Sequence, residues 1–157
     1  MIKTLTYFPK NTLYALVSIS IVGLALNFLW ENLQAPLYAG YTGFIQHLSI
    51  CSMATLGDLT IILFMYIYSS LIFKDVLWFQ NLSLKSVLSL LIIGVIVGVG
   101  IEKWALLTDR WTYGYNMPII PLLGVGLTPV LQMIILPILT FSFSAKMLVW
   151  CRLNLLH

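Results

Sequence analysis

Four long runs of apolar residues dominate the chain, and short polar or Pro/Gly-rich stretches separate them. Each run is long enough for one bilayer crossing, because about 20 helical residues span about 30 Å of hydrocarbon. A residue that precedes proline is disfavoured in a helix, so the first helix should end before Pro36. The pattern predicts membrane-spanning helices at about residues 12–35, 45–73, 86–106 and 127–149.

The connection before the last predicted helix is the most unusual stretch of the chain. Residues 102–132 hold two of the five acidic residues, two of the five tryptophans and three of the six prolines. Residues 119–126 are apolar but interrupted by proline and glycine. Non-helical backbone at membrane depth is tolerated only where protein or water satisfies it. We therefore expect a short re-entrant or interfacial segment here.

Composition places the chain in the membrane. Hydrophobic residues make up 61% of the 157 residues and charged residues only 8%, against about half and about a quarter in soluble proteins. A soluble domain could not cover its surface with so few charges. We expect an all-α, polytopic helical bundle that forms one transmembrane domain over residues 1–157. The basic residues form no stripe or motif, so no nucleic-acid partner is expected.

The distribution of basic residues predicts the orientation in the membrane. With four crossings, the termini and the 74–85 connection share one side, which carries six basic residues: Lys3, Lys10, Lys74, Lys85, Lys146 and Arg152. The other side carries Lys103 and Arg110. Because cytoplasmic loops are enriched in Lys and Arg, we expect both termini in the cytoplasm of a bacterial cell, with the chain in the inner membrane.

Each predicted helix carries an acidic or amide side chain near its outer end. Glu31 and Glu102 close the first and third helices, while Asp58 and Gln132 lie about one turn inside the second and fourth. Ionisable groups at membrane depth are costly unless they pair or line a cavity, so they are candidates for function. We therefore take Asp58, Glu102 and Glu31 as candidate catalytic acids.

Amide, basic and aromatic side chains at the same level are the candidate substrate-binding groups: Gln132, Asn27, Trp104, Arg110, Trp111 and Tyr113. An interfacial aromatic belt accounts for most of the aromatic residues. Aromatic faces would also attract positive charge on an apolar substrate, and burial beside them would keep a carboxyl group protonated as a general acid. Asp58 has no basic neighbour in sequence, so Lys103 or Arg110 is its expected partner. The alternative is a purely structural cluster that holds the helices together.

Two further patterns concern metal binding and helix packing. His47 and Cys51, at positions i and i+4, are possible metal ligands, but Met53 faces elsewhere and no second Cys or His lies nearby. No metal or other cofactor is therefore expected. Gly94 and Gly98 form a small-xxx-small face that lets another helix approach closely, so a homo-oligomer through this face is possible.

The stretch from Trp111 to Gln132 resembles the small integral-membrane lycopene cyclase domain. The shared features are an acid, the run Trp111-Thr-Tyr113 and a Pro/Gly-rich segment that leads to Pro129-x-x-Gln132. The family has a Pro-x-Glu-Glu motif where this chain has Leu131 and Gln132. The acid would then have to be Glu31, Asp58 or Glu102. The stretch is also similar to uncharacterised small bacterial multi-pass membrane proteins.

The resemblance implies an isoprenoid or another apolar lipid as substrate. Together with the polar residues, it favours a membrane-embedded cyclase- or isomerase-like enzyme that uses a carboxylic acid. A proton, cation or small-solute transport subunit and a non-catalytic accessory membrane protein are the alternatives.

Overall fold

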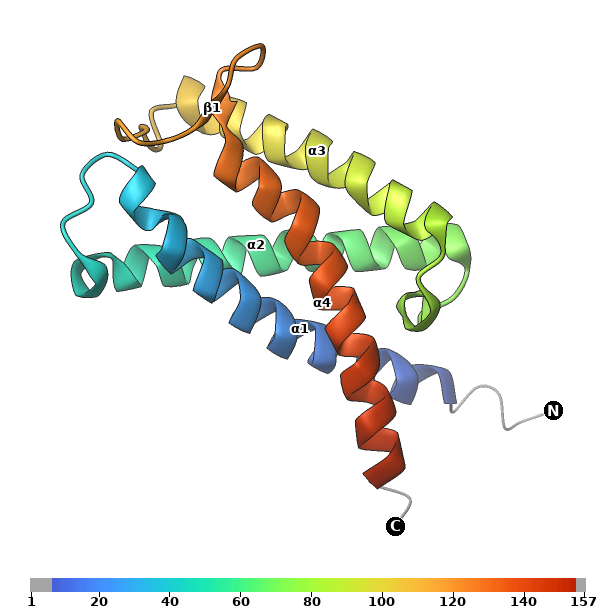
Figure 1. The fold of residues 1–157 in the computed structure, drawn as a ribbon. Coiled ribbons are helices and arrows are strands. Elements are labelled where there is room, and N and C mark those ends of the chain that lie inside the picture. Colours follow the sequence, from blue (N-terminus) through green and yellow to red (C-terminus); the bar gives the residue numbers. More distant parts are fainter. Residues whose placement is uncertain (1–6, 155–157) are drawn as a thin grey trace.

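Four long helices make up most of the chain (Figure 1). The computed structural model describes residues 7–154. Its helices are α1 (Tyr7–Gln34), α2 (Phe44–Phe73), α3 (Leu84–Leu107) and α4 (Leu127–Asn154). All four contain spans that are long and apolar enough to cross a membrane. The predicted all-α fold of a multi-pass membrane protein is confirmed, although α1 begins earlier and α4 ends later than expected.

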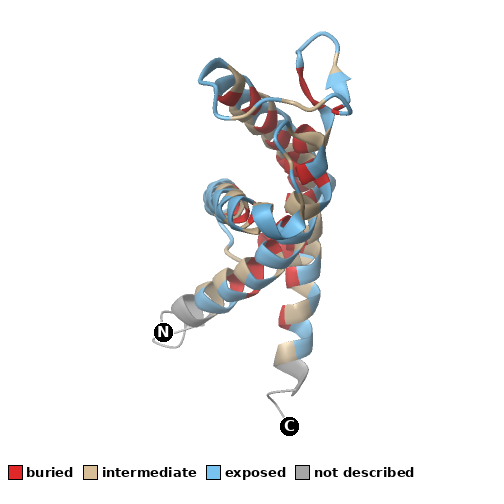
Figure 2. Cartoon of the chain, turned by 90° about the vertical axis from the view of Figure 1, so that its left-hand side faces the viewer, coloured by how far each residue is buried: buried red, intermediate tan, exposed pale blue. Residues whose placement is uncertain are grey.

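The helices form an open arrangement. Helix α4 packs against α1 on one side and α3 on the other, and α2 packs against α1. Helices α2 and α3 contact each other little, so the chain consists of two helical hairpins that meet along α1 and α4 (Figures 1 and 2). Side chains from α1, α2 and α4 can therefore converge, whereas α3 reaches the rest mainly through α4.

Two glycines set the close approach of α3 to α4. A Cβ atom added at Gly94 would lie 3.0 Å from the carbonyl carbon of Met133, and one added at Gly98 would lie 3.2 Å from the Met133 Cβ. Both glycines are buried. The small-xxx-small pattern thus serves packing within one chain, and the face that we expected to be available to a second copy is occupied by α4. A homo-oligomer would have to use another surface.

An apolar core fills the end of the helices that carries the connection between α2 and α3. This connection contains a short 3-10 helix, η2 (Trp78–Asn81), which turns its aromatic side chains inward. The ring centroids of Trp78 and Phe79 lie 4.9 and 6.1 Å from that of Phe141 of α4. Polar side chains gather toward the other end of the helices.

The connections at that other end pack against each other. A 3-10 helix, η1 (Ala35–Leu37), follows α1, and a small antiparallel hairpin of β1 (Ile119–Ile120) and β2 (Val125–Gly126) precedes α4. The hairpin projects beyond the ends of α3 and α4 (Figure 1). Residues 119–126 are therefore a tight hairpin rather than a loop that dips between the helices. Gly124 closes the turn with a φ of 62°, a conformation that glycine adopts without strain.

Candidate functional site

Polar side chains from three helices meet in one hydrogen-bonded group, which we call the carboxyl–amide cluster: Asn27, Glu31 and Gln34 of α1, Asp58 of α2, and Gln132 of α4. The amide nitrogen of Gln132 is its centre. This Nε2 lies 2.8 Å from Glu31 Oε1, 2.7 Å from Asp58 Oδ2 and 3.2 Å from Asn27 Oδ1. One side chain of α4 thus joins α1 to α2 through polar contacts.

Gln34 completes the cluster, although it was not among the predicted site residues. Its Nε2 donates to Glu31 Oε1 at 2.7 Å and to Gln132 Oε1 at 2.8 Å. The indole nitrogen of Trp30 donates to Gln34 Oε1 at 3.1 Å. Asn27, Glu31 and Gln34 are spaced i, i+4 and i+7 along one helical face. This spacing is the sequence signal that points to Gln34.

The prediction that Lys103 or Arg110 pairs with Asp58 is wrong. Asp58 bonds to the Gln132 amide, and among the described residues no Lys or Arg forms an ion pair with Asp58 or Glu31. The Arg110 guanidinium instead lies 5.2 Å from the centroid of a Trp104 ring. The carboxyl groups of Glu31 and Asp58 instead accept hydrogen bonds from the same amide nitrogen, that of Gln132.

Glu102 belongs to a second group at the end of α3. The Tyr113 hydroxyl donates to Glu102 Oε2, and the Gly126 N–H of β2 donates to that hydroxyl at 2.7 Å. Within the described residues, Glu102 makes no hydrogen bond to the carboxyl–amide cluster. The buried indole nitrogen of Trp111 lies close to the Glu102 carboxyl without a regular hydrogen bond. The four acidic and amide residues predicted near the outer ends of the helices are therefore divided between two groups: Glu31, Asp58 and Gln132 in one, and Glu102 in the other.

Tyr38, which follows η1, connects the two groups. Its ring centroid lies 6.2 Å from that of Trp111 and 6.0 Å from that of Tyr113. Burial raises the pKa of the Tyr38 hydroxyl, and so do the negative charges of nearby groups, namely Glu102, Glu31, Tyr113 and Asp58. Tyr38 thus follows directly on the end of α1 and η1, while its ring packs beside two aromatic side chains of the Glu102 group. From the sequence, Tyr38 is only one more member of the aromatic belt, because it reaches this position through the pairing of its loop with the distant loop that holds Tyr113.

The remaining predicted residues lie outside the two groups. Trp104 is 51% exposed and carries Arg110 over its ring, so neither faces the carboxyl groups. A ring nitrogen of His47 lies 3.3 Å from the Gly43 carbonyl oxygen, and the Cys51 thiol faces the Glu31 carbonyl oxygen at 3.8 Å. Over residues 7–154, no set of three or more His, Cys, Asp or Glu side chains is arranged to hold a metal ion.

Replacing Tyr113 by phenylalanine is expected to lower the free energy of unfolding by about 1–3 kcal/mol, because Glu102 and the buried Gly126 N–H would each lose a partner. Burial, followed by the bond to Glu102, raises the pKa of the Tyr113 hydroxyl. The neutral hydroxyl therefore stabilises the fold below its ordinary pKa of about 10, and this contribution is lost as pH rises above that value. Thermal unfolding in mild detergent at neutral and alkaline pH measures both effects.

Tyr115 is the matched control, because its side chain is fully exposed. Tyr115→Phe should leave the unfolding temperature unchanged at every pH. Equal behaviour of the two variants would show that the Tyr113 contacts contribute nothing to stability.

Comparison of the chain with families of known proteins, with curated proteins and with solved structures finds no match. The functional inference therefore depends on the side chains of the two polar groups.

Proposed function

We propose that the protein acts on an isoprenoid or another apolar lipid within the membrane, by acid–base chemistry of the cyclase or isomerase type. One observation carries this proposal: Glu31 and Asp58 share the single amide nitrogen of Gln132, and no Lys or Arg among the described residues forms an ion pair with either carboxyl group. Two negative charges placed so close together in a bilayer would be very costly. The pair is best explained as a carboxylic acid beside a carboxylate.

The hydrogen-bond capacity of the cluster supports a shared proton. The Gln132 amide nitrogen has two hydrogens but faces three acceptor oxygens, those of Asn27, Glu31 and Asp58. A proton on one carboxyl group supplies the missing donor. The same proton can be given to a substrate, because the side chains of Glu31 and Asp58 are only partly buried, unlike those of Asn27 and Gln132.

The chemistry that suits such a pair is proton transfer to a carbon–carbon double bond. The acid member gives its proton to one alkene carbon and leaves a carbocation on the other. A carboxylate then removes a proton from a neighbouring carbon, so the double bond re-forms in a new position or after ring closure. No net oxidation occurs and no co-reactant is needed. Glu102, buried and bonded to Tyr113, is the second candidate for the base.

Aromatic side chains stand where the cation would need stabilisation. Tyr38 follows η1 at the end of α1, and its ring packs against those of Trp111 and Tyr113. The faces of aromatic rings attract positive charge most strongly where water is excluded. We assign these three residues to the substrate-binding wall, together with Asn27 and Gln132 as positioning groups. Trp104 and Arg110 are better placed to meet the membrane surface.

Asp58→Asn keeps the shape of the side chain and removes its ability to carry the proton. We expect the product lipid to fall by about 100-fold or more, the usual contribution of a positioned acid, while its precursor accumulates. Chromatography coupled to mass spectrometry on lipid extracts of strains that carry each variant measures this, since isomers of equal mass separate by retention time. Asp109→Asn changes an exposed acid outside both groups and should leave the lipids unchanged. Identical extracts from the Asp58→Asn strain and wild type would sink the proposal.

A second candidate function, proton transport, is favoured by a different observation. Three buried hydroxyl groups, those of Ser69, Thr140 and Ser144, have no hydrogen-bond partner among the described residues. Thr140 and Ser144 follow Gln132 on α4 toward the opposite end of the helices. Internal water that joined such groups would extend a proton path from the cluster. Proton flux into liposomes that contain the purified protein separates the two functions, since a lipid enzyme should give none.

We further propose that the protein lies in a bacterial inner membrane with both termini in the cytoplasm. The support is the bias of basic residues, which places Lys74, Lys85 and Lys146 on one side and Lys103 and Arg110 on the other. Labelling of single cysteines introduced at Lys74 and at Asp109 with a membrane-impermeant reagent tests this orientation.

A further inference from the structure

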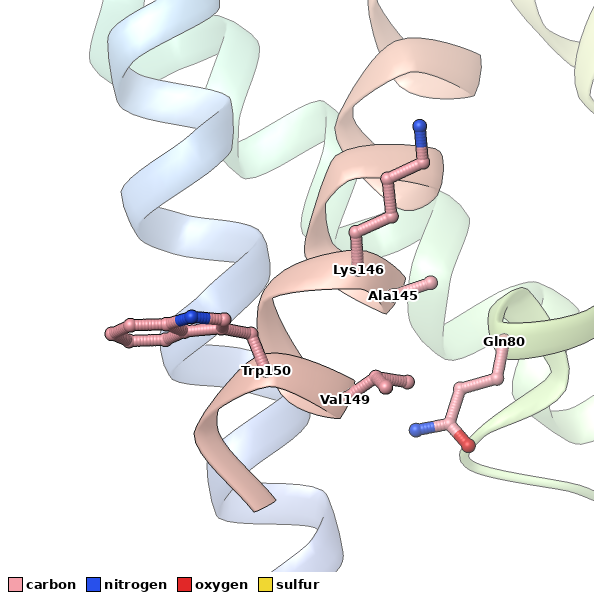
Figure 3. Close-up of a pocket in the computed structure, with 5 residues that line it drawn as sticks. All are labelled: Gln80, Ala145, Lys146, Val149 and Trp150. Atoms are coloured by element: carbon pink, nitrogen blue, oxygen red, sulfur yellow. The ribbon is translucent and has the colours of Figure 1, made fainter. Parts of the chain in front are cut away.

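A cavity of about 380 Å³, open to the surface, lies between η2 and the last turns of α4 (Figure 3). Gln132 of the carboxyl–amide cluster lies toward the other end of the same helix. Gln80 of η2 forms one wall, and the other is made by α4 residues: Ala145, Lys146, Val149 and Trp150. Among the described residues, the cavity is therefore lined by apolar, amide, cationic and indole groups but by no acidic side chain.

The amide nitrogen of Gln80 is a hydrogen-bond donor that lacks an acceptor within the described residues. Its Nε2 is buried and has no hydrogen-bond partner among the described residues. Figure 3 shows this nitrogen turned toward Val149, across the space between η2 and α4. A buried N–H group without a partner loses its hydration and gains nothing in return. A turn of this amide toward the cavity would let it donate to an oxygen atom bound there.

Lys146 supplies the positive charge. Its ammonium group lies 5.7 Å from the Phe143 ring centroid, and its side chain extends along α4 rather than toward Gln80 (Figure 3). Because a lysine stem is long and flexible, the ammonium group can swing toward a ligand at the membrane surface while the stem stays on apolar surface. The exposed indole of Trp150 on the next turn is typical of the membrane–water interface.

We propose that this cavity binds the headgroup of an anionic phospholipid. The phosphate oxygens accept hydrogen bonds from Gln80 Nε2 and Lys146 Nζ, and an acyl chain lies along Ala145 and Val149. Two features select a lipid over a soluble anion: the cationic and amide donors adjoin apolar surface, and the whole site lies at the end of a membrane-spanning helix. This site is separate from the carboxyl groups and does not depend on the proposed reaction.

Binding is tested on the purified full-length chain in a neutral detergent, by titration with phosphatidylglycerol and, separately, with phosphatidylcholine. The unfolding temperature and native mass spectrometry report binding. We expect phosphatidylglycerol to raise the unfolding temperature and to remain attached, whereas phosphatidylcholine does neither. Lys146→Gln and Gln80→Leu should each weaken the apparent affinity for phosphatidylglycerol about tenfold, as expected for the loss of one hydrogen bond to a charged group.

Lys85→Gln is the matched control, because Lys85 is exposed near the start of α3 and does not line the cavity. It removes the same charge and should leave the affinity unchanged. Lys146 is also exposed, so its variant should fold even if Gln80→Leu does not. Equal binding of the two lipids, equal weakening by Lys85→Gln and Lys146→Gln, or saturation of the site by inorganic phosphate alone would each overturn the proposal.

Discussion

Gly94→Ala is expected to destabilise the protein by about 2 kcal/mol or more, the cost of forcing extra volume into a well-packed contact. The added Cβ would press on the main chain of Met133. Backbone in the middle of a helix cannot move aside as a side chain would, so α3 must shift away from α4. Reversible unfolding in mixed micelles measures the loss.

The local backbone explains why α3 comes so close here. Pro137 has no N–H group, so the carbonyl of Met133, four residues earlier, lacks its usual partner within α4. Gly94 points its Cα hydrogen at that carbonyl oxygen, a weak but favourable contact. Alanine would replace this contact with a clash.

Gly100→Ala is the matched control on the same helix. A Cβ there meets no atom within 4 Å, and alanine favours a helix by about 1 kcal/mol relative to glycine. We expect it to leave stability unchanged or to raise it slightly. If both variants lost the same amount, the contact between α3 and α4 would not be limited by Gly94.

Gln132→Leu is the second change for which we expect a large effect. Leucine keeps most of the volume but removes the donor shared by Asn27, Glu31 and Asp58 and the acceptor used by Gln34. Each buried polar group left without a partner costs about 1–3 kcal/mol, so a loss of about 3 kcal/mol in the free energy of unfolding is a conservative expectation. Thermal unfolding of the detergent-solubilised protein measures it.

Gln46→Leu is the control for Gln132→Leu, because Gln46 is exposed near the start of α2.

A double-variant cycle tests the contact between Asp58 and Gln132 directly. Since Asp58 and Gln132 are in direct contact, the effects of Asp58→Asn and Gln132→Leu should not add. Additive losses in the free energy of unfolding would mean that the two side chains act independently. That result would contradict the proposal of a shared proton.

The two polar groups have different consequences for function. The carboxyl–amide cluster joins α1, α2 and α4, so its residues contribute to stability as well as to any chemistry. For this reason the stability of Asp58→Asn must be measured beside its lipid profile. Glu102 depends on the hairpin and on Tyr113 instead, so substitutions there should alter the 108–126 connection and leave the contact between α1 and α2 intact.

The apolar runs by themselves determined the four helices and the membrane class, because hydrocarbon leaves a chain few ways to satisfy its backbone other than a helix. They also placed Glu31, Asp58, Glu102 and Gln132 near one level, since depth follows from counting residues along a helix. The i, i+4, i+7 spacing of Asn27, Glu31 and Gln34 already placed Gln34 on the polar face of α1. These properties are local or depend only on distance along the chain.

Only the tertiary structure decided which of these groups meet. The open packing, in which α2 and α3 hardly touch, brings Asp58 to Gln132 and leaves Glu102 to Tyr113. The Gly94 and Gly98 face is filled by α4, because a glycine pattern shows that some helix approaches but not which one. Tyr38 joins the site through a contact between loops that lie far apart in sequence. Partners across the molecule depend on the packing of whole helices, which the spacing of residues along one helix does not contain.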